Sequence, residues 1–330
     1  MSFPLTFDNL LTMRRYGSTW LKIGVTLLGL AVAASQITLA ELNNTLQQVR
    51  WPGLLLMFLL INASLALRAG RWWILLRGLG SRLPFGRLVA LYVAGNFFNV
   101  FLPSGFGGDV VRVVEAARDV SPAAAAGTAL VDRLTGLMML FVFALLTLPF
   151  RPTDFPPGQA IVVAGVSLAG LLGSFWLLDG RLLRRLGRRL PRLLSPVGEG
   201  PTARLLAAVQ GCGWGAIAGA LGVSVVFNAM LVGWWVVAGI SLGYAIPIRY
   251  YLLAVPLLSV ALLVPSVGGL GVREAVAPLL FAAAGLSHSQ AVALSLLEFT
   301  VVRLAGLAGA PVYLWFVLRR SRGYGAAANE

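Results

Sequence analysis

PSGFGG at residues 103–108 and PSVGGLG at residues 265–271 each end an apolar stretch, residues 88–103 and 250–265 respectively. Proline removes a backbone donor and glycine permits sharp turns, so each stretch is expected to be a helix that breaks at a fixed point. Both stretches are shorter than the roughly 20 residues that a helix needs to cross a bilayer. The sequence therefore predicts two broken helices.

The composition of the chain is that of a polytopic membrane protein. Of 330 residues, 58% are apolar and only 12% are charged, whereas soluble domains carry about 25% charged residues. The 26 basic and 12 acidic residues give a net charge of +14. The basic excess lies in short loops, where it indicates topology and lipid contact rather than nucleic-acid binding.

Six apolar runs are long enough to cross about 30 Å of hydrocarbon as helices. They lie at residues 20–40, 51–76, 124–149, 159–178, 212–240 and 291–317. The first run is too long for the core of a signal peptide and lacks a clear cleavage site, so we expect a retained N-terminal anchor. The expected fold class is all-α, with about six full transmembrane helices and two re-entrant broken-helix hairpins in an inverted repeat.

Basic loops set the expected orientation, because arginine and lysine favour the cytoplasmic side. Two groups place the ends of the second and fourth runs inside: Arg77, Arg82 and Arg87, and Arg181, Arg184, Arg185, Arg188, Arg189, Arg192 and Arg204. The loop 151–158 holds only Arg151 and is expected outside. The chain is thus inside after the second run and must be inside again before the third run, which ends outside. Segment 88–120 therefore has to enter from the inside and return, as a re-entrant hairpin or as two closely packed crossings. A second hairpin, 250–285, opens from the outside, and both termini are cytoplasmic.

The two breaks also indicate an internal repeat. Each is followed by a basic residue and then by a span that carries RLTGL at residues 133–137 or RLAGL at residues 303–307. We interpret residues 1–158 and 159–330 as repeats of opposite orientation, an architecture that places a transport site between broken helices at the membrane midplane. The alternative is chance recurrence in a compositionally biased sequence.

Four charged residues, Asp132, Arg133, Glu298 and Arg303, lie well inside apolar spans. Such a charge costs about 2.5–3.5 kcal/mol, so each requires a partner or a wet cavity. The two charges of each span point in different directions on their helix and cannot pair well locally. We expect partners on other elements, most simply across the two halves, which would gather four charges around one central cavity. The alternative is a buried ion-pair lock without a role in transport.

The glycine turns predict a second kind of chemistry. Backbone groups at membrane depth must be enclosed by protein or water, and helices that begin near Gly108 and Gly271 would aim free N–H groups into that space. This arrangement predicts an anion site, to which Ser104, Ser266, Asn96 and Asn99 could contribute side chains. The alternatives are tight helix packing at the glycines and interhelical hydrogen bonds from the two asparagines.

Arginine also marks two expected membrane-surface elements. The basic loop 180–204 contains arginines on one face of residues 181–190 and leucines on the other, until Pro191 ends the helix. This pattern is typical of an interfacial amphipathic helix that attracts anionic headgroups, and the alternative is a simple topology determinant. Arg68 and Arg71, beside two tryptophans, resemble an interfacial anchor.

Enzymatic functions find little support in the sequence. The single cysteine, Cys212, excludes a disulfide framework, and the single histidine, His288, excludes metal sites built from several histidines. No nucleophile and base pair is apparent. We therefore expect neither catalysis nor a cofactor.

Four segments carry a resemblance to a known family. They are NFFNVFLPSGFGGDVVR at residues 96–112, DRL at 132–134, VPSVGGLGVRE at 264–274, and the pair RW at 71–72. Over roughly residues 18–318 the chain resembles the flippase-like transmembrane family, typified by the membrane portion of bacterial lysylphosphatidylglycerol synthases. We expect a stand-alone member without the soluble aminoacyl transferase domain of those synthases.

The resemblance implies that the protein moves a lipid headgroup between leaflets. The expected substrate-binding residues are Asn99, Ser104, Gly107, Gly108, Asp109, Arg112, Asp132, Arg133, Ser266, Gly268, Gly269, Arg273, Glu274, Glu298 and Arg303. The expected partner is an anionic phospholipid or isoprenoid-linked lipid in a bacterial-type cytoplasmic membrane. The alternatives are a non-transporting scaffold for a lipid-biosynthetic enzyme and, less favoured, an intramembrane lipid-modifying enzyme.

Cysteine-accessibility labelling in intact membranes tests the expected topology. Phe155→Cys should react with an impermeant maleimide from the outside and Leu186→Cys from the inside, because the second position lies in the arginine-rich loop. Labelling of position 155 from the inside, or of position 186 from the outside, would contradict the arrangement.

Overall fold

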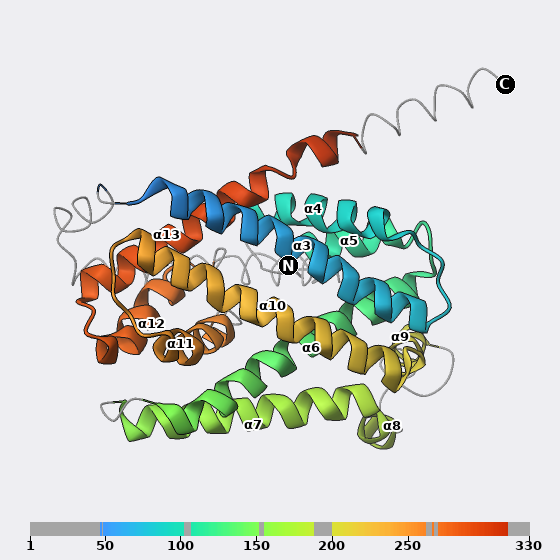
Figure 1. Ribbon diagram of the computed structural model, residues 1–330. Helices are drawn as coiled ribbons and strands as arrows, with labels where there is room; N and C mark the ends of the chain where they lie inside the picture. Colours follow the sequence, from blue (N-terminus) through green and yellow to red (C-terminus); the bar gives the residue numbers. More distant parts are fainter. Residues whose placement is uncertain are drawn as a thin grey trace, which may run out of the picture.

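The computed structural model describes residues 47, 49–101, 107–151, 155–187, 200–261, 266 and 270–315, and every regular element in these residues is a helix (Figure 1). In chain order the helices are α3 (Trp51–Gly78), α4 (Phe85–Phe101), α5 (Gly107–Ala116), α6 (Pro122–Thr147), η1 (Leu148–Phe150), α7 (Pro157–Asp179), α8 (Arg181–Gly187), α9 (Pro201–Gly211), α10 (Gly213–Ser241), α11 (Ile248–Ala261), α12 (Val272–Phe281), η2 (Ala282–Ala284) and α13 (His288–Leu307). The expected all-α class is confirmed.

Five helical segments are long and apolar enough to cross a membrane. They are Trp51–Gly78, Pro122–Phe150, Pro157–Asp179, Gly213–Ser241 and His288–Trp315. Length and composition thereby confirm five of the six expected crossings, and the chain is a multi-pass membrane protein. The remaining expected crossing, the first in the chain at residues 20–40, lies outside the described residues.

Serine and glycine set where several of these helices begin and end. The hydroxyls of Ser121 and Ser287 each accept a backbone N–H at 3.2 Å at the starts of α6 and α13, which satisfies donors that a first helical turn leaves open. Gly180 ends α7 with a φ of +64°, a left-handed conformation that favours glycine. The chain turns there into the arginine-rich α8.

Helices α3 and α10 pack side by side in antiparallel directions (Figure 1). At one end of the pair, the N–H of Arg50 donates to the carbonyl of Ser241 at 2.9 Å. At the other end, Gly78 lies against the backbone of Cys212. The end of α3 and the start of α10 are therefore at the same end of the bundle.

The two broken segments form helical hairpins at opposite ends of the bundle (Figure 1). The hairpin α4–α5 starts where α3 ends, and the hairpin α11–α12 starts where the antiparallel α10 ends. Helices α5 and α12 have 10 residues each, which makes them about 15 Å long, half of the hydrocarbon thickness. These lengths agree with hairpins that enter and return rather than with paired full crossings.

The first hairpin closes through a contact between two glycines. A Cβ on Gly95 of α4 would lie 2.7 Å from the carbonyl oxygen of Gly108 on α5, and a Cβ on Gly108 would collide with the carbonyl of Gly95. The side chain of Asn99 adds a second tie, because its Oδ1 accepts from the N–H of Gly108 at 2.7 Å. Glycine is therefore required here for the close approach of two backbones.

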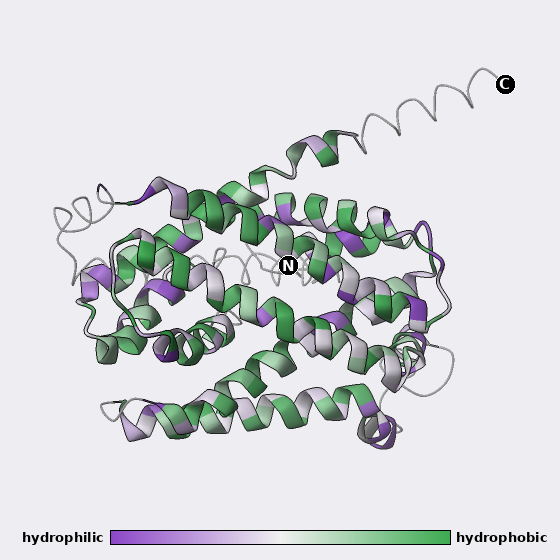
Figure 2. Cartoon of the chain, viewed as in Figure 1, coloured by the Kyte–Doolittle hydropathy of each residue, from purple (hydrophilic) through white to green (hydrophobic). Residues whose placement is uncertain are grey.

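Apolar residues predominate along the helices, which are largely green in Figure 2, and many large apolar side chains are exposed. On α7, Ile161 and Val162 are 73% and 63% exposed, and Leu168 and Leu172 are more than half exposed. A soluble monomer rarely presents apolar patches of this extent. The pattern fits helices whose outer faces contact lipid.

Gly95→Ala should destabilise the protein by about 1–3 kcal/mol, because the added Cβ meets backbone that can move only if the hairpin opens. Gly86→Ala is the matched control on the same helix, since a Cβ there has no neighbour within 4 Å. The control should leave stability unchanged or raise it by roughly 0.5–1 kcal/mol. Reversible unfolding in mixed detergent micelles measures both variants, and equal stability would contradict the close glycine contact.

Candidate functional site

Asp132 is the centre of a buried polar cluster. It lies on α6 with 0% exposure, and its carboxylate accepts from Arg71 Nε at 2.6 Å, from Arg112 Nη2 at 2.9 Å and from the hydroxyl of Tyr92. These three donors come from α3, α5 and α4 and are themselves buried. One carboxylate therefore joins four helices, including both arms of the first hairpin.

Aromatic rings and a serine complete the surroundings of the two arginines. The guanidinium carbon of Arg112 lies 4.3 Å from the ring centre of Tyr92 and 4.8 Å from that of Trp72, distances at which a ring attracts a cation. Arg71 donates to the hydroxyl of Ser224 at 3.0 Å. Because Ser224 belongs to α10, the cluster reaches the second half of the chain.

Asp109 extends the cluster to Arg133. It lies in the first turn of α5, where the positive end of the helix dipole favours a carboxylate. Its oxygens face Arg112 Nε at 2.9 Å and Arg133 of α6. The first ion-pair cluster consists of Arg71, Asp109, Arg112, Asp132 and Arg133.

A second ion-pair cluster, consisting of Arg273, Glu274 and Glu298, joins the second hairpin to α13. Arg273 of α12 pairs with Glu298 of α13, and both are buried. Glu274 accepts from the N–H of Gly271 at 2.7 Å, which caps the start of α12, and from the hydroxyl of Ser295 at 3.2 Å. Each half of the chain thus binds its own hairpin to the span that follows it.

Arg303 connects the second half to the broken end of the first hairpin. From α13, its Nη1 donates to the carbonyl of Val100 at 2.9 Å and to that of Asn99, in the last turn of α4. A helix end leaves such carbonyls without partners inside the helix, and its negative dipole end favours a cation. The guanidinium also lies 4.8 Å from the ring centre of Phe299. A residue from the second half of the chain therefore stabilises this end of the first hairpin.

This arrangement corrects the expected pairing of the four charges inside the spans. The contacts described for Asp132, Arg133, Glu298 and Arg303 lead to the hairpins and not from one of these four residues to another. The first three pair with the hairpin of their own half, and the fourth binds backbone carbonyls. Each hairpin returns directly beside the span that follows it, so α5 and α12 offer nearer partners than the other half does.

The N–H groups expected to face an anion at the hairpin breaks are also used inside the protein. That of Gly108 donates to Asn99 and that of Gly271 to Glu274, because backbone donors at membrane depth require partners. The hydroxyl of Ser266, by contrast, is buried without a hydrogen-bond partner among the described residues. Part of the expected anion site therefore forms hydrogen bonds within the protein that hold the hairpins in place.

Several expected elements lie partly outside the described residues. Gly107 is buried at the start of α5, whereas Ser104, Gly268 and Gly269 are outside. Of the expected interfacial helix, residues 181–187 form α8, in which Arg184 and Arg185 are exposed, and the remainder is outside.

Arg71 and Trp72 lie in the core and not in the interfacial anchor that the sequence suggested. Their exposed fractions are 4% and 0%. Arg71 is about two turns from the end of α3, so a snorkelling side chain could reach the membrane surface from there. It points into the core instead, because Asp132 is a buried partner for its guanidinium. Tyr92 was not predicted, although a tyrosine inside the mostly apolar stretch 88–103 is a signal that could have indicated it.

A small polar cavity adjoins the first ion-pair cluster. Its lining includes Arg68, Asn96, Asn99, Asp109 and Arg112, and its volume is about 10 Å³, room for about one water molecule. Nη1 of Arg112 and Nδ2 of Asn96 are buried without a hydrogen-bond partner in the described part of the chain. Within the same residues Arg68 forms no ion pair with a carboxylate. In this conformation the space is too small for a phosphate headgroup.

Fold and site define a multi-pass membrane protein whose broken-helix hairpins are held by buried ion pairs. The family model described as the lysylphosphatidylglycerol synthase TM region matches residues 19–309, and the chain belongs to this family. The family links the protein to lipid handling and confirms the resemblance seen in the sequence. No curated protein and no solved structure matches the chain. Within the described ranges, no three His, Cys, Asp or Glu side chains are grouped so as to hold a metal ion.

Asp132→Ala should lower the free energy of unfolding by about 3–5 kcal/mol, because it leaves two buried arginines without their shared counter-ion. Asp119→Ala is the matched control, since Asp119 pairs with Arg87 at 3.2 Å in a partly exposed position. Such a surface pair contributes about 0–1 kcal/mol. Unfolding in mixed micelles compares the two variants. A similar, small loss in both would show that Asp132 does not hold the helices together.

Proposed function

We propose that this protein is a flippase that moves the headgroup of an anionic phospholipid or an isoprenoid-linked lipid between the leaflets of a bacterial-type cytoplasmic membrane. The headgroup passes along a central polar path while the acyl or isoprenoid tails remain in lipid. Membership of the family supports the general role in lipid handling. The more specific activity rests on the first ion-pair cluster.

A surplus of positive charge at this cluster is the observation that carries the proposal. Among the described residues, four arginines face two aspartates there: Arg68, Arg71, Arg112 and Arg133, with Asp109 and Asp132. Uncompensated charge at membrane depth is costly, and an anionic ligand would compensate it. Phosphate suits such a site, because a guanidinium binds its oxygens through two directed hydrogen bonds.

Buried donors at the cavity support the same ligand. Nη1 of Arg112 and Nδ2 of Asn96 have no hydrogen-bond partner among the described residues, and the guanidinium of Arg68 lines the same space. All three groups donate and none accepts, so they favour a ligand that is rich in acceptors. Admission of a headgroup requires the cavity to open, and the closed cavity corresponds to the occluded stage of the proposed cycle.

Two repeats of opposite orientation, residues 1–158 and 159–330, supply the proposed movement. The antiparallel packing of α3 against α10 and the hairpins at opposite ends of the bundle support this arrangement. The distribution of arginines supports cytoplasmic positions for both termini. In transporters of this design one repeat rocks against the other around a midplane site. The contact between Arg303 and the end of α4 lies on that boundary.

Asp132 has a positioning role in this proposal rather than a proton-carrying one. Its carboxylate already accepts from three donors, and it thereby orients the guanidinium groups of Arg71 and Arg112. Arg68 and Arg112 bind the phosphate. Asp109, which faces Arg112 in the closed cavity, gives up this contact when the headgroup enters.

Arg68→Gln should abolish most lipid translocation and preserve the fold, because Arg68 contacts the rings of Tyr92 and Phe227 but no carboxylate of the described residues. Loss of a charge-assisted hydrogen bond costs about 1.5–3 kcal/mol, roughly a ten- to hundredfold loss of binding. Arg68→Lys should recover only part of the activity, since lysine lacks the planar fork. Leaflet-specific quenching of fluorescent phosphatidylglycerol in proteoliposomes measures the rate.

Arg184→Gln is the matched control, because Arg184 is exposed on α8 and lies outside the cluster. It should weaken lipid recruitment only mildly. Wild-type rates in Arg68→Gln would contradict the phosphate site. If the protein redistributes none of the lipids that co-purify with it, the alternative of a scaffold for a lipid-biosynthetic enzyme would be favoured.

A further inference from the structure

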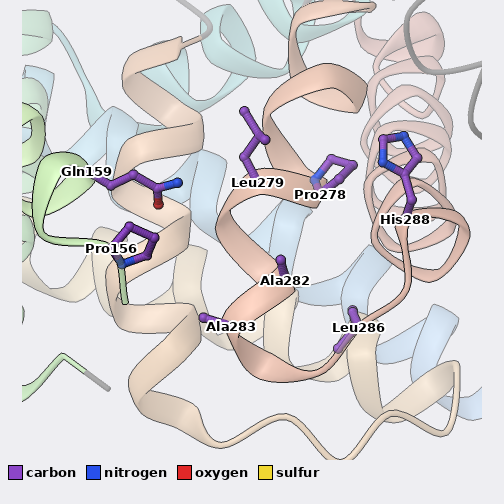
Figure 3. Close-up of a pocket in the computed structure, with 8 residues that line it drawn as sticks. All are labelled: Pro156, Gln159, Pro278, Leu279, Ala282, Ala283, Leu286 and His288. Atoms are coloured by element: carbon purple, nitrogen blue, oxygen red, sulfur yellow. The ribbon is translucent and has the colours of Figure 1, made fainter. Parts of the chain in front are cut away.

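A larger pocket lies at the end of the bundle away from the first hairpin. The start of α7, helices α12 and η2, and the turn into α13 surround it (Figure 3). Its volume is about 510 Å³, within the range of small-ligand sites. None of the residues that line it belongs to either ion-pair cluster. This pocket is therefore a feature separate from the site already described.

Two buried polar atoms at this pocket are unpaired within the described residues. They are Oε1 of Gln159 and Nε2 of His288. Figure 3 shows the two side chains on opposite sides of the pocket, one from α7 and the other from the start of α13. Buried polar atoms are nearly always hydrogen-bonded in native proteins. The pair therefore suits a ligand that brings both an acceptor and a donor.

The rest of the pocket points to a ligand that is partly apolar. Apart from Gln159 and His288, the lining consists of proline, leucine and alanine side chains, and one of them, Leu279, is 62% exposed. Helices α7 and α13, which both belong to membrane-crossing segments, begin at this pocket. The pocket consequently lies where two spans start, at the boundary between headgroups and hydrocarbon. A molecule with polar and apolar parts at this level is a membrane lipid.

We propose that this pocket binds a glycerophospholipid whose headgroup carries N–H or O–H donors. The phosphate accepts from Nε2 of His288, which donates in one neutral tautomer and in the imidazolium. The headgroup donates to Oε1 of Gln159, and an acyl chain covers Leu279. This is a recognition site at the membrane surface, and it goes beyond the proposed flippase activity because it does not require transport.

The single histidine of the chain makes the proposal directly testable. Isotope-labelled histidine gives one imidazole signal, and the full chain in micelles is titrated with dioctanoyl phosphatidylethanolamine or dioctanoyl phosphatidylcholine. The two lipids share charge and chain length, but choline has no N–H donor. We expect a saturable shift of the His288 signal, with about tenfold tighter binding of the ethanolamine lipid, the effect of one hydrogen bond.

Three variants assign the response to the pocket. Gln159→Leu should bind both lipids equally, because it removes the acceptor that distinguishes them. Ala282→Phe should lose the saturable shift, since Ala282 lines the pocket and the ring would fill it. Ala218→Phe is the matched control, because Ala218 is exposed on α10 and does not line the pocket. It should respond as the wild type does.

Two results would overturn the proposal: equal affinity of the wild type for the two lipids, or an unchanged response in Ala282→Phe. Glycerophosphoethanolamine, the same headgroup without acyl chains, should cause no shift at the same concentrations. An equal response to it would overturn the lipid assignment in favour of a soluble phosphate compound. The readout is binding at His288, so its failure is distinct from a failure of transport in Arg68→Gln.

Discussion

The carboxylate of Asp132 is the group around which the first half of the protein packs. A lone charge in the middle of a membrane is costly, and Asp132 has no exposed surface. Donors from α3, α4 and α5 surround it, so these helices satisfy their polar side chains only when all of them meet α6 at one point. Apolar helix faces alone would not drive this association, because they are as well solvated by lipid as by one another. The ion pairs therefore select one arrangement among those that close packing allows.

The same constraint governs the broken hairpins, where it acts on the backbone. A glycine turn at membrane depth leaves N–H and C=O groups that lipid cannot satisfy. Side chains form hydrogen bonds with these backbone groups instead: Asn99 accepts at the start of α5, Arg303 donates at the end of α4, and Glu274 accepts at the start of α12. Residues that resemble ligand-binding groups in the sequence thus support the turns themselves. In the proposed flippase cycle these contacts would have to be exchanged when the hairpins move. One of them, between Arg303 and the end of α4, joins the two halves of the chain.

The two hairpin regions differ in charge. The first cluster and Arg68 together carry more arginines than aspartates, whereas Arg273 and Arg303 are matched by Glu274 and Glu298 among the described residues. The first half is consequently the better location for an anionic headgroup in the proposed cycle. The pocket between α7 and α13 has a different character, because its lining is neutral and largely apolar. One site suits a phosphate held by charge and the other a lipid held by shape and hydrogen bonds.

The sequence by itself determined the features that depend on neighbouring residues. Apolar runs predicted the five spans that the structure describes. It also indicated that the charges inside the spans pair away from their own helices. Only the tertiary structure decided which partners they take. Arg71 was predicted to be interfacial because it stands beside two tryptophans, which is a local pattern. Its contact with Asp132 is not local, because the two residues are 61 positions apart. Gln159 and His288 carry no local signal at all, and they line one pocket because two spans that are distant in the sequence both begin at it.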